Sequence, residues 1–180
     1  MLEKLTRRTV WCLVLLLALC STTIPFKVTG AQTVTGPVEV VDGDTFHFAS
    51  GLKVRLYGLD TLEKNQRCQV GPACVPCGQQ TKAEAISIVG KHDVSCKLTG
   101  QKTYDREVGI CTVDGKDYTT AIIDAGWGLA YRQFLPKRGK GHEYVLAEER
   151  AKAAGVGIWA MTFVPPADWR NRKMRLQCER

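Results

Sequence analysis

The sequence has few histidines, no internal repeat and no second run of paired cysteines. Its three histidines, His47, His92 and His142, are isolated from one another, so we expect no metal role for them. The absence of a repeat excludes a solenoid, and a length of 180 residues is typical of one domain. The motif "CVPC" (Cys74–Cys77) has no matching pair nearby, which argues against a zinc or redox site.

An apolar run long enough to cross a membrane is also missing. The run Val10–Cys20 follows three basic residues and is too short to span a bilayer comfortably. This pattern predicts a signal peptide over residues 1–31, with an uncleaved N-terminal anchor as the alternative. We therefore expect a secreted or periplasmic protein whose residues 32–180 form a single domain, with no stable membrane insertion after cleavage.

Removal of the predicted signal peptide changes the net charge and the number of cysteines. The whole chain has a formal net charge of +7, and loss of residues 1–31 leaves a mildly basic domain, which suits an anionic partner. The cysteines that remain are even in number, which in an exported chain indicates disulfide bonds. They are Cys68, Cys74, Cys77, Cys96, Cys111 and Cys178.

Alternation of polar and apolar residues predicts five short strands. They are expected at residues 38–41, 45–48, 53–60, 93–98 and 107–113. Because Cys96 and Cys111 lie in the middle of the last two strands, which can pair as a hairpin, they are the best candidates for one disulfide. Cys68–Cys77 is the next pair, and Cys74–Cys178 is left by elimination.

Three helices are predicted from helical spacing and capping residues. The first covers 81–90, with Thr81 and Glu84 as a capping box. The second is capped by Asp117 and ends near Gly126, and the third covers 143–154 and stops at Gly155. Residues 64–78 are expected to form a loop stapled by a disulfide.

These elements favour an α+β fold that is mainly β. A sheet with one apolar face can remove its edges by closing into a small barrel, and the five-stranded Greek-key version is the OB-fold. We therefore expect a five-stranded OB-fold barrel with about three helices, stapled by disulfides.

Charged residues gather at the predicted strand ends. "DGDT" (Asp42–Thr45) has two carboxylates around one glycine, which alone would more often be a plain turn. "RLYGLDTLE" (Arg55–Glu63) follows, and Arg106 comes before a later strand. Arg55 and Asp60 would point to opposite faces of one strand unless a bulge at Gly58 re-aims one of them.

Taken in order, these stretches closely resemble the signature of the staphylococcal-nuclease-like (thermonuclease) family. "TYDREVG" (Thr103–Gly109) and "AEERAKAAGVGIWA" (Ala147–Ala160) look like downstream blocks of that family. The resemblance covers roughly residues 36–170 and implies an OB-fold barrel with helices, which agrees with the strand count reached independently.

The resemblance implies a calcium site. Asp44 and Asp60 would supply carboxylate oxygens to Ca²⁺, and the backbone carbonyl of Thr61 would be a third ligand. Asp42 aligns with an acid that acts on the metal through water. Glu63 matches the general base.

The resemblance also implies phosphate and nucleotide contacts. Arg55 and Arg106 match two arginines that hold the reacting phosphate, and an arginine fork suits phosphate geometry. Tyr104 and Tyr131 would line the nucleotide pocket, with help from Lys102. Basic residues of the tail are expected to be solvated, with nucleic-acid contact as the minor alternative; these are Arg170, Arg172, Lys173 and Arg175.

Two departures from the family pattern bear on rate. Leu62 stands where the family usually has proline, so the turn from Asp60 to Glu63 is expected to be less rigid. Asp105 stands where glycine usually precedes the arginine, and it adds negative charge beside Arg106 while tolerating left-handed geometry.

The resemblance thus implies a calcium-dependent nuclease that hydrolyses DNA and RNA with little sequence preference and leaves 3′-phosphate ends, and we expect it to be a monomer. Hydrolysis of a phosphodiester needs an activated water, charge neutralisation and positioning, and these residue types supply all three. One alternative is a non-catalytic OB-fold that binds single strands. Another is an exported structural domain in which the acids bind calcium only for stability.

Overall fold

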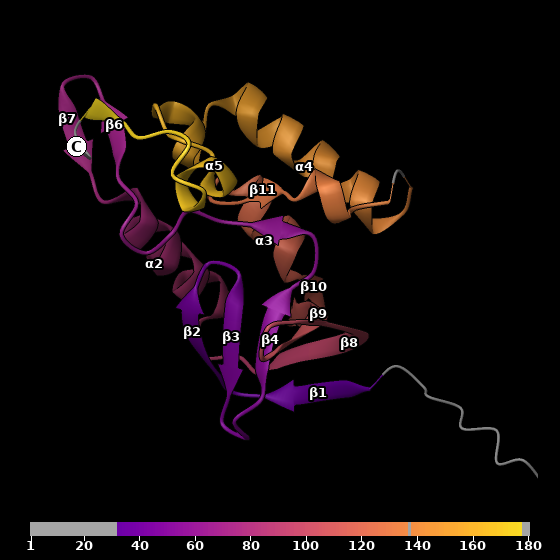
Figure 1. The fold of residues 1–180 in the computed structure, drawn as a ribbon. Helices are drawn as coiled ribbons and strands as arrows, with labels where there is room; N and C mark the ends of the chain where they lie inside the picture. Colours follow the sequence, from indigo (N-terminus) through magenta and orange to yellow (C-terminus); the bar gives the residue numbers. More distant parts are fainter. Residues whose placement is uncertain (1–31, 137, 178–180) are drawn as a thin grey trace, which may run out of the picture. The chain divides into compact units, whose positions relative to one another are not determined.

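A computed structural model describes residues 32–136 and 138–177 of the chain (Figure 1). The expected signal peptide and Cys178 lie outside the described residues. The fold is mixed α+β and mainly β. None of the helices in the described ranges is long and apolar enough to cross a membrane.

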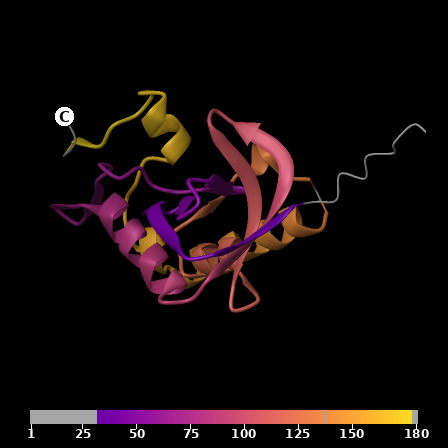
Figure 2. The same cartoon turned by 90° about the horizontal axis from the view of Figure 1, so that it is seen from below.

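The main sheet has the strand order β1-β8-β9-β4-β3-β2, with β10 paired to β9. Only the pairing of β4 with β9 is parallel. Pro37 alone separates β1 from β2, although these strands lie at opposite ends of that order, so the sheet curls (Figure 2). The strands are β1 (Thr33–Gly36), β2 (Val38–Asp42), β3 (Thr45–Phe48), β4 (Lys53–Leu56), β8 (Val94–Thr103), β9 (Arg106–Val113) and β10 (Lys116–Asp117).

The prediction of one strand over residues 53–60 is wrong. β4 ends at Leu56, and the chain turns through Gly58, whose φ of 71° suits glycine. The next strand, β5 (Leu59–Asp60), then pairs with β11 (Leu129–Ala130) in a separate small sheet. The alternating pattern could not reveal this break because it continues across the turn.

The segment 64–78 is more regular than the predicted loop. It contains a hairpin of β6 (Cys68–Val70) and β7 (Ala73–Val75), followed directly by helix α2 (Cys77–Val89). The predicted capping box is wrong, because Thr81 lies inside α2 and its hydroxyl donates to the Cys77 carbonyl at 3.0 Å. The helix begins earlier than predicted because Pro76 and the disulfide at Cys77 fix its first turn.

The other helices agree better with their capping residues. α3 (Tyr118–Asp124) begins where predicted, with the Asp117 carboxylate accepting from the Thr120 amide at 2.8 Å. α4 (Lys140–Ala154) starts three residues early but stops at Gly155, which is left-handed as expected. The remaining helical segments were not predicted; they are η1 (Arg132–Phe134), η2 (Gly157–Ala160) and α5 (Pro166–Arg170).

The core under the curled sheet is apolar and is covered by α2, α3 and α4. Tyr118 of α3 is fully buried, and its ring packs edge-on against Phe46 of β3 at 4.8 Å between centroids. Its hydroxyl donates to the Gly43 carbonyl at 2.9 Å. This contact ties a core helix to the turn that carries Asp42 and Asp44.

Two of the predicted disulfides are confirmed. Cys96 lies directly opposite Cys111 in the β8–β9 register, and the two are bonded. Cys68 is bonded to Cys77, which joins the β6–β7 hairpin to the start of α2. Cys74 is also disulfide-bonded, but its predicted partner, Cys178, lies outside the described residues.

The buried bridge between β8 and β9 is expected to matter for stability. Replacing both Cys96 and Cys111 with alanine should lower the free energy of unfolding by about 2–4 kcal/mol, because a cross-link across 15 residues no longer restricts the unfolded chain. Urea denaturation of the double variant measures this. An unchanged unfolding free energy would contradict a stabilising role for the bridge.

Candidate active site

The turn from Asp42 to Asp44 is a local structure held by its own side chain. The Asp42 carboxylate accepts from the backbone amide of Asp44 at 3.1 Å, as expected of an aspartate in a turn. Asp44 points inward, with only 3% of its surface exposed. The two acids therefore differ: Asp42 shapes the turn at the rim, and Asp44 delivers a buried carboxylate.

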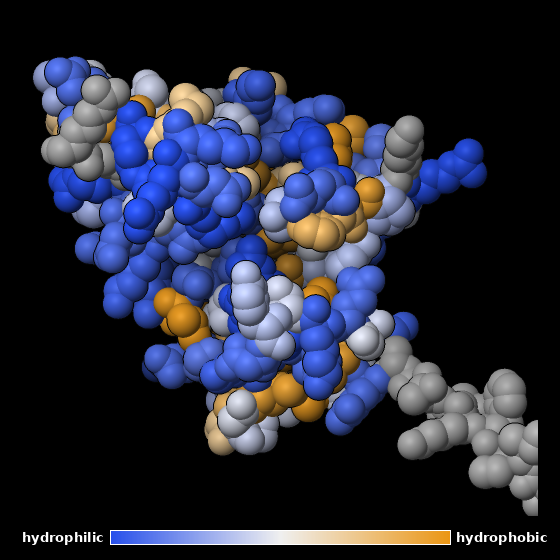
Figure 3. Space-filling model, in the orientation of Figure 1, coloured by the Kyte–Doolittle hydropathy of each residue, from blue (hydrophilic) through white to orange (hydrophobic). Residues whose placement is uncertain are grey.

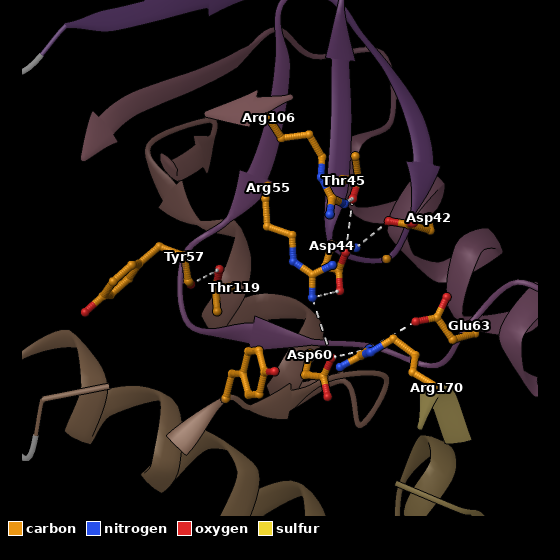
Figure 4. A network of polar contacts seen from close by, with 12 residues as sticks. Asp42, Asp44, Thr45, Arg55, Tyr57, Asp60, Glu63, Arg106, Thr119 and Arg170 are labelled. Atoms are coloured by element: carbon orange, nitrogen blue, oxygen red, sulfur yellow. Dashed lines mark hydrogen bonds and ion pairs between the residues drawn. The ribbon is translucent and has the colours of Figure 1, made fainter. Parts of the chain in front are cut away.

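Arg55 joins Asp44 to Asp60. One of its terminal nitrogens, Nη2, lies 2.9 Å from Asp44 Oδ2 and 3.5 Å from Asp60 Oδ1 (Figure 4). The turn at Gly58 makes this possible, because it takes Asp60 off the line of β4. The sequence predicts that a bulge at Gly58 turns Arg55 or Asp60 toward the other. The two side chains do meet, but Gly58 forms a turn between β4 and β5 and not a bulge within one strand.

The charge of Asp44 is poorly compensated. Burial raises the pKa of its carboxyl, Arg55 opposes that shift, and the negative charges of Asp42 and Asp60 add to it, so that the pKa is about 7. A raised pKa of this origin means that the site would favour additional positive charge close to Asp44.

Arg106 reaches the same place from the start of β9. Its Nη1 donates to the Thr45 hydroxyl at 3.2 Å, which in turn donates to Asp44 Oδ1 at 3.1 Å. The negative charge that Asp105 places beside Arg106 is compensated by Lys53. The Lys53 ammonium lies 2.5 Å from the Asp105 carboxylate, and this pairing lowers the pKa of Asp105. The left-handed residue of the hairpin is Tyr104, with a φ of 56°, and not Asp105 as expected.

The segment carrying Glu63 is fixed by buried contacts. Leu62 is 1% exposed and packs with the Cys68–Cys77 bridge, so its side chain anchors the turn where the family usually has proline. Gln66 is fully buried, and its side-chain oxygen Oε1 accepts a hydrogen bond from the Glu63 backbone amide at 3.2 Å. The expectation of a less rigid turn from Asp60 to Glu63 is therefore not supported by its packing.

Sequence reasoning missed one residue of the site. Arg170, at the end of α5, places Nη1 2.8 Å from Asp60 Oδ1 and 3.0 Å from Glu63 Oε1 (Figure 4). Burial disfavours its charged form, but the hydrogen bonds and charges of Asp60 and Glu63 outweigh burial and raise the pKa of Arg170. Its place in a basic tail, far along the chain from its partners, gave no signal beyond a surface charge.

These side chains surround one polar cavity of about 230 Å³. Asp60 lies at its edge through its contacts with Arg55 and Arg170. The structure therefore brings together every residue for which a metal or catalytic role was predicted. The cavity lining consists of Asp42, Asp44, Arg55, Thr61, Leu62, Glu63, Arg106 and Arg170.

A larger cavity of about 510 Å³ adjoins the first, since Arg55 lines both. Lys102 and Tyr131 line it, as the predicted nucleotide contacts require, together with Tyr57 and Phe134. Tyr104 is not brought in: its side chain is 93% exposed at the tip of the β8–β9 hairpin. Its left-handed backbone keeps it in the turn, outside the cavity lining.

The residues of the polar cavity fit a hard cation. Asp44 and Asp60 share one arginine nitrogen, Thr61 is buried and lines the cavity, and Asp44 is buried with the negative charges of Asp42 and Asp60 near it. In the described part of the chain, no three His, Cys, Asp or Glu side chains are arranged to hold a metal on their own. The expected ligand set is smaller than such a group: it has two carboxylates and a carbonyl and leaves other positions to water and substrate.

Gln66 offers a direct test of how this site is held. Gln66→Met should lower the free energy of unfolding by about 2–4 kcal/mol, because the Glu63 amide and the Val164 carbonyl, which Gln66 contacts at 2.5 Å, both lose their partner. Urea denaturation measures the loss. The control is Gln79→Met, the same change at an exposed position of α2; equal stability of the two variants would contradict the role of Gln66.

Comparison with known proteins gives one family and several relatives. The family model described as staphylococcal nuclease homologue matches residues 53–161. This is shorter than the resemblance seen in the sequence: Asp42 and Asp44 precede the match and Arg170 follows it.

Three curated relatives match at modest identity. The succinoglycan biosynthesis protein ExoI of Rhizobium meliloti is 31% identical over 132 residues, which span 72% of this chain and 66% of that protein. An uncharacterized endonuclease of Haemophilus influenzae is 27% identical over 143 residues, 76% of this chain and 72% of its own. An uncharacterized 38.1 kDa protein of Capnoides sempervirens is 27% identical over 122 residues, 67% of this chain and 32% of its own.

Proposed function

Because the chain belongs to the staphylococcal nuclease homologue family, we propose that it is a calcium-dependent nuclease. It hydrolyses phosphodiester bonds of DNA and RNA with little sequence preference. The observation that supports this best is the convergence of two arginines, Arg55 and Arg106, with the carboxylates of Asp44, Asp60 and Glu63 around one polar cavity. The relative of this chain whose name contains "endonuclease" agrees with this activity.

Arg55 and Arg106 bind the scissile phosphate. Both enter the cavity from the sheet, Arg55 from β4 and Arg106 from the start of β9, so a phosphate between them would be held from two sides. Guanidinium groups donate paired hydrogen bonds to phosphate oxygens and neutralise the charge that develops there during hydrolysis.

Glu63 accepts the proton of the attacking water. Its carboxylate lines the same cavity, and its backbone is held by Gln66, so the base is positioned before substrate arrives. The water oxygen bonds to phosphorus as the bond to the 5′ oxygen of the next nucleotide breaks. That oxygen takes a proton from solvent water and leaves as a hydroxyl, so the products carry 3′-phosphate and 5′-hydroxyl ends.

Asp44, Asp60 and the Thr61 carbonyl would hold the calcium ion, with Asp42 acting on it through water. The bound ion supplies positive charge beside the phosphate. The buried carboxylate of Asp44, with Asp42 and Asp60 near it, supports this assignment. Lys102 and Tyr131 bind the neighbouring nucleotide in the adjoining cavity, and Tyr104 contacts substrate only at the exposed hairpin tip.

The proposal extends to the fold and the setting of the enzyme. We propose that residues 32–180 form a single domain in which β1 and β2 act as one bent strand, so that the curled sheet is a five-stranded OB-fold barrel. The order of pairing and the parallel β4–β9 pair support this. The protein is exported by residues 1–31 and, with two described disulfides, suits an oxidising compartment.

We also propose that the enzyme is a monomer. Large exposed apolar side chains come from different elements, and the face in Figure 3 is mostly hydrophilic. The exposed apolar residues are Val70, Ile86, Tyr104, Phe134, Leu146, Val156 and Met174.

A plasmid-nicking assay with and without a calcium chelator tests the function. Nicking that requires calcium supports the proposal. A non-catalytic OB-fold would bind single strands without cleaving them, and a structural domain would do neither. Full activity in excess chelator would remove calcium from the mechanism.

A further inference from the structure

Arg170 is the one cation of the polar cavity that comes from outside the part of the chain matched to the family. It belongs to α5, the last helix, and its side chain is 31% exposed. It holds Asp60 and Glu63 at the same time, through one nitrogen. It therefore bridges the acid proposed to bind calcium and the acid proposed to act as base.

The fold delivers α5 to this place through buried contacts. Val164, just before the helix, is 1% exposed, and its carbonyl accepts from the Gln66 side chain at 2.5 Å. Thr162 and Gln69 exchange backbone hydrogen bonds at 2.8 and 2.9 Å, which fastens the same segment to the β6–β7 hairpin. The position of Arg170 is thus built into the structure and is not that of a loose tail.

The contacts of Arg170 conflict with the proposed reaction. Asp60 Oδ1 lies 2.8 Å from Arg170 and 3.5 Å from Arg55, so a calcium ion on that oxygen would meet a guanidinium at contact distance. Like charges so close repel strongly in a partly buried site. Glu63 Oε1 likewise can take a proton from water only after Arg170 has released it. Both carboxylates become fully accessible when Arg170 changes partners.

A phosphodiester is the anion that can replace the carboxylates as the partner of Arg170. Four carboxylates and three arginines are grouped there, counting Asp60 at the edge. When a divalent cation takes up the carboxylates, an arginine loses its counter-ions, and the anion that arrives with the reaction is the phosphate. Arginine binds phosphate with two parallel hydrogen bonds, and a side chain that is one-third exposed has room to rotate.

We propose that Arg170 is a third substrate-binding arginine that exchanges partners during the reaction. It pairs with Asp60 and Glu63 in the free enzyme and with the phosphodiester in the complex. This inference rests on the proposed function and adds to it a residue of the C-terminal segment.

The test is Arg170→Ala, measured by titration calorimetry in two experiments. In the first, calcium is titrated into the free protein, and its affinity should rise about threefold to tenfold because a competing cation is gone. In the second, thymidine 3′,5′-bisphosphate is titrated into the calcium-saturated protein, and its affinity should fall about tenfold because a charged hydrogen-bond donor is gone. Opposite changes in the two affinities support the exchange.

Other outcomes overturn it. If both affinities rise, Arg170 is only an internal inhibitor; if both fall together with the melting temperature, its role is only structural. Arg170→Lys should bind the nucleotide less tightly than the wild type, because the fork is lost while the charge is kept. If the wild-type protein binds neither calcium nor the nucleotide, the proposed function itself fails.

Lys173→Ala is the matched control for charge. Lys173 is three residues further along, is 67% exposed, pairs with Asp168 at 3.6 Å and does not line the cavity. Both affinities should stay within about twofold of the wild type. If Lys173→Ala reproduces the effects of Arg170→Ala, they come from net charge, and the exchange of partners is excluded.

Discussion

Glu63→Gln is expected to lower the turnover number by about 100-fold or more, because a positioned general base contributes about that much. The amide cannot accept the proton of water, although it occupies the same volume. The fold and the nucleic-acid affinity should persist, since the Glu63 amide still bonds to Gln66 and Arg55 and Arg106 are unchanged. Single-turnover cleavage of a labelled oligonucleotide measures the loss.

The matched control for this variant is Glu39→Gln. Glu39 is exposed on β2 and does not line the cavity. The Glu39→Gln variant loses the same negative charge as Glu63→Gln, and its turnover number should equal that of the wild type. Unchanged turnover in purified Glu63→Gln would remove Glu63 from the mechanism, and an equal loss in both variants would point to a general effect of charge.

Asp44→Asn is expected to weaken calcium binding by about 100-fold or more, since it removes one of only two charged ligands from a nearly buried position. The amide keeps the volume of the side chain and can still accept from Thr45. In the wild type, calcium binding should tighten when thymidine 3′,5′-bisphosphate is present, because phosphate oxygens complete the ligand set. In Asp44→Asn this coupling should vanish.

The coupling has a thermodynamic check. Calcium must tighten the nucleotide by the same factor by which the nucleotide tightens calcium, and calorimetry measures both. Asp42→Asn is the control: its amide oxygen still accepts from the Asp44 backbone, so calcium binding should weaken only moderately. Identical calcium affinity with and without nucleotide in the wild type would falsify a shared calcium–phosphate site.

Much of the site was predictable because its residues lie in short stretches with strong local signals. The Asp-Gly turn set the place of Asp42 and Asp44, and the glycine at position 58 marked the irregularity that lets Arg55 meet Asp60. The caps at Asp117 and Gly155 were predictable for the same reason, since a cap depends on a few neighbouring residues.

The parts that sequence reasoning missed depend on contacts between distant segments. β1 is stabilised by pairing with β8, and the residues of Thr33–Gly36 alone do not predict this pairing. The start of α2 was misplaced because a disulfide and a proline outweighed a capping pattern. The local sequence around Arg170 predicts a solvated charge, because its partners Asp60 and Glu63 are about a hundred residues earlier and meet it only through the packing of α5.

The parallel pairing of β4 with β9 also sets when the proposed phosphate site can form. Arg55 on β4 lies beside Val108 on β9, and β1 pairs with β8. Both strand pairs join segments that are far apart in the sequence, so forming them closes long loops. Such non-local pairing is slow compared with the formation of helices and hairpins. During synthesis, a nascent chain that ends before β9 carries Asp44 and Arg55 without Arg106 to complete the phosphate site. The proposed phosphate site is therefore incomplete until β9 has paired with β4, and only the C-terminal segment adds Arg170.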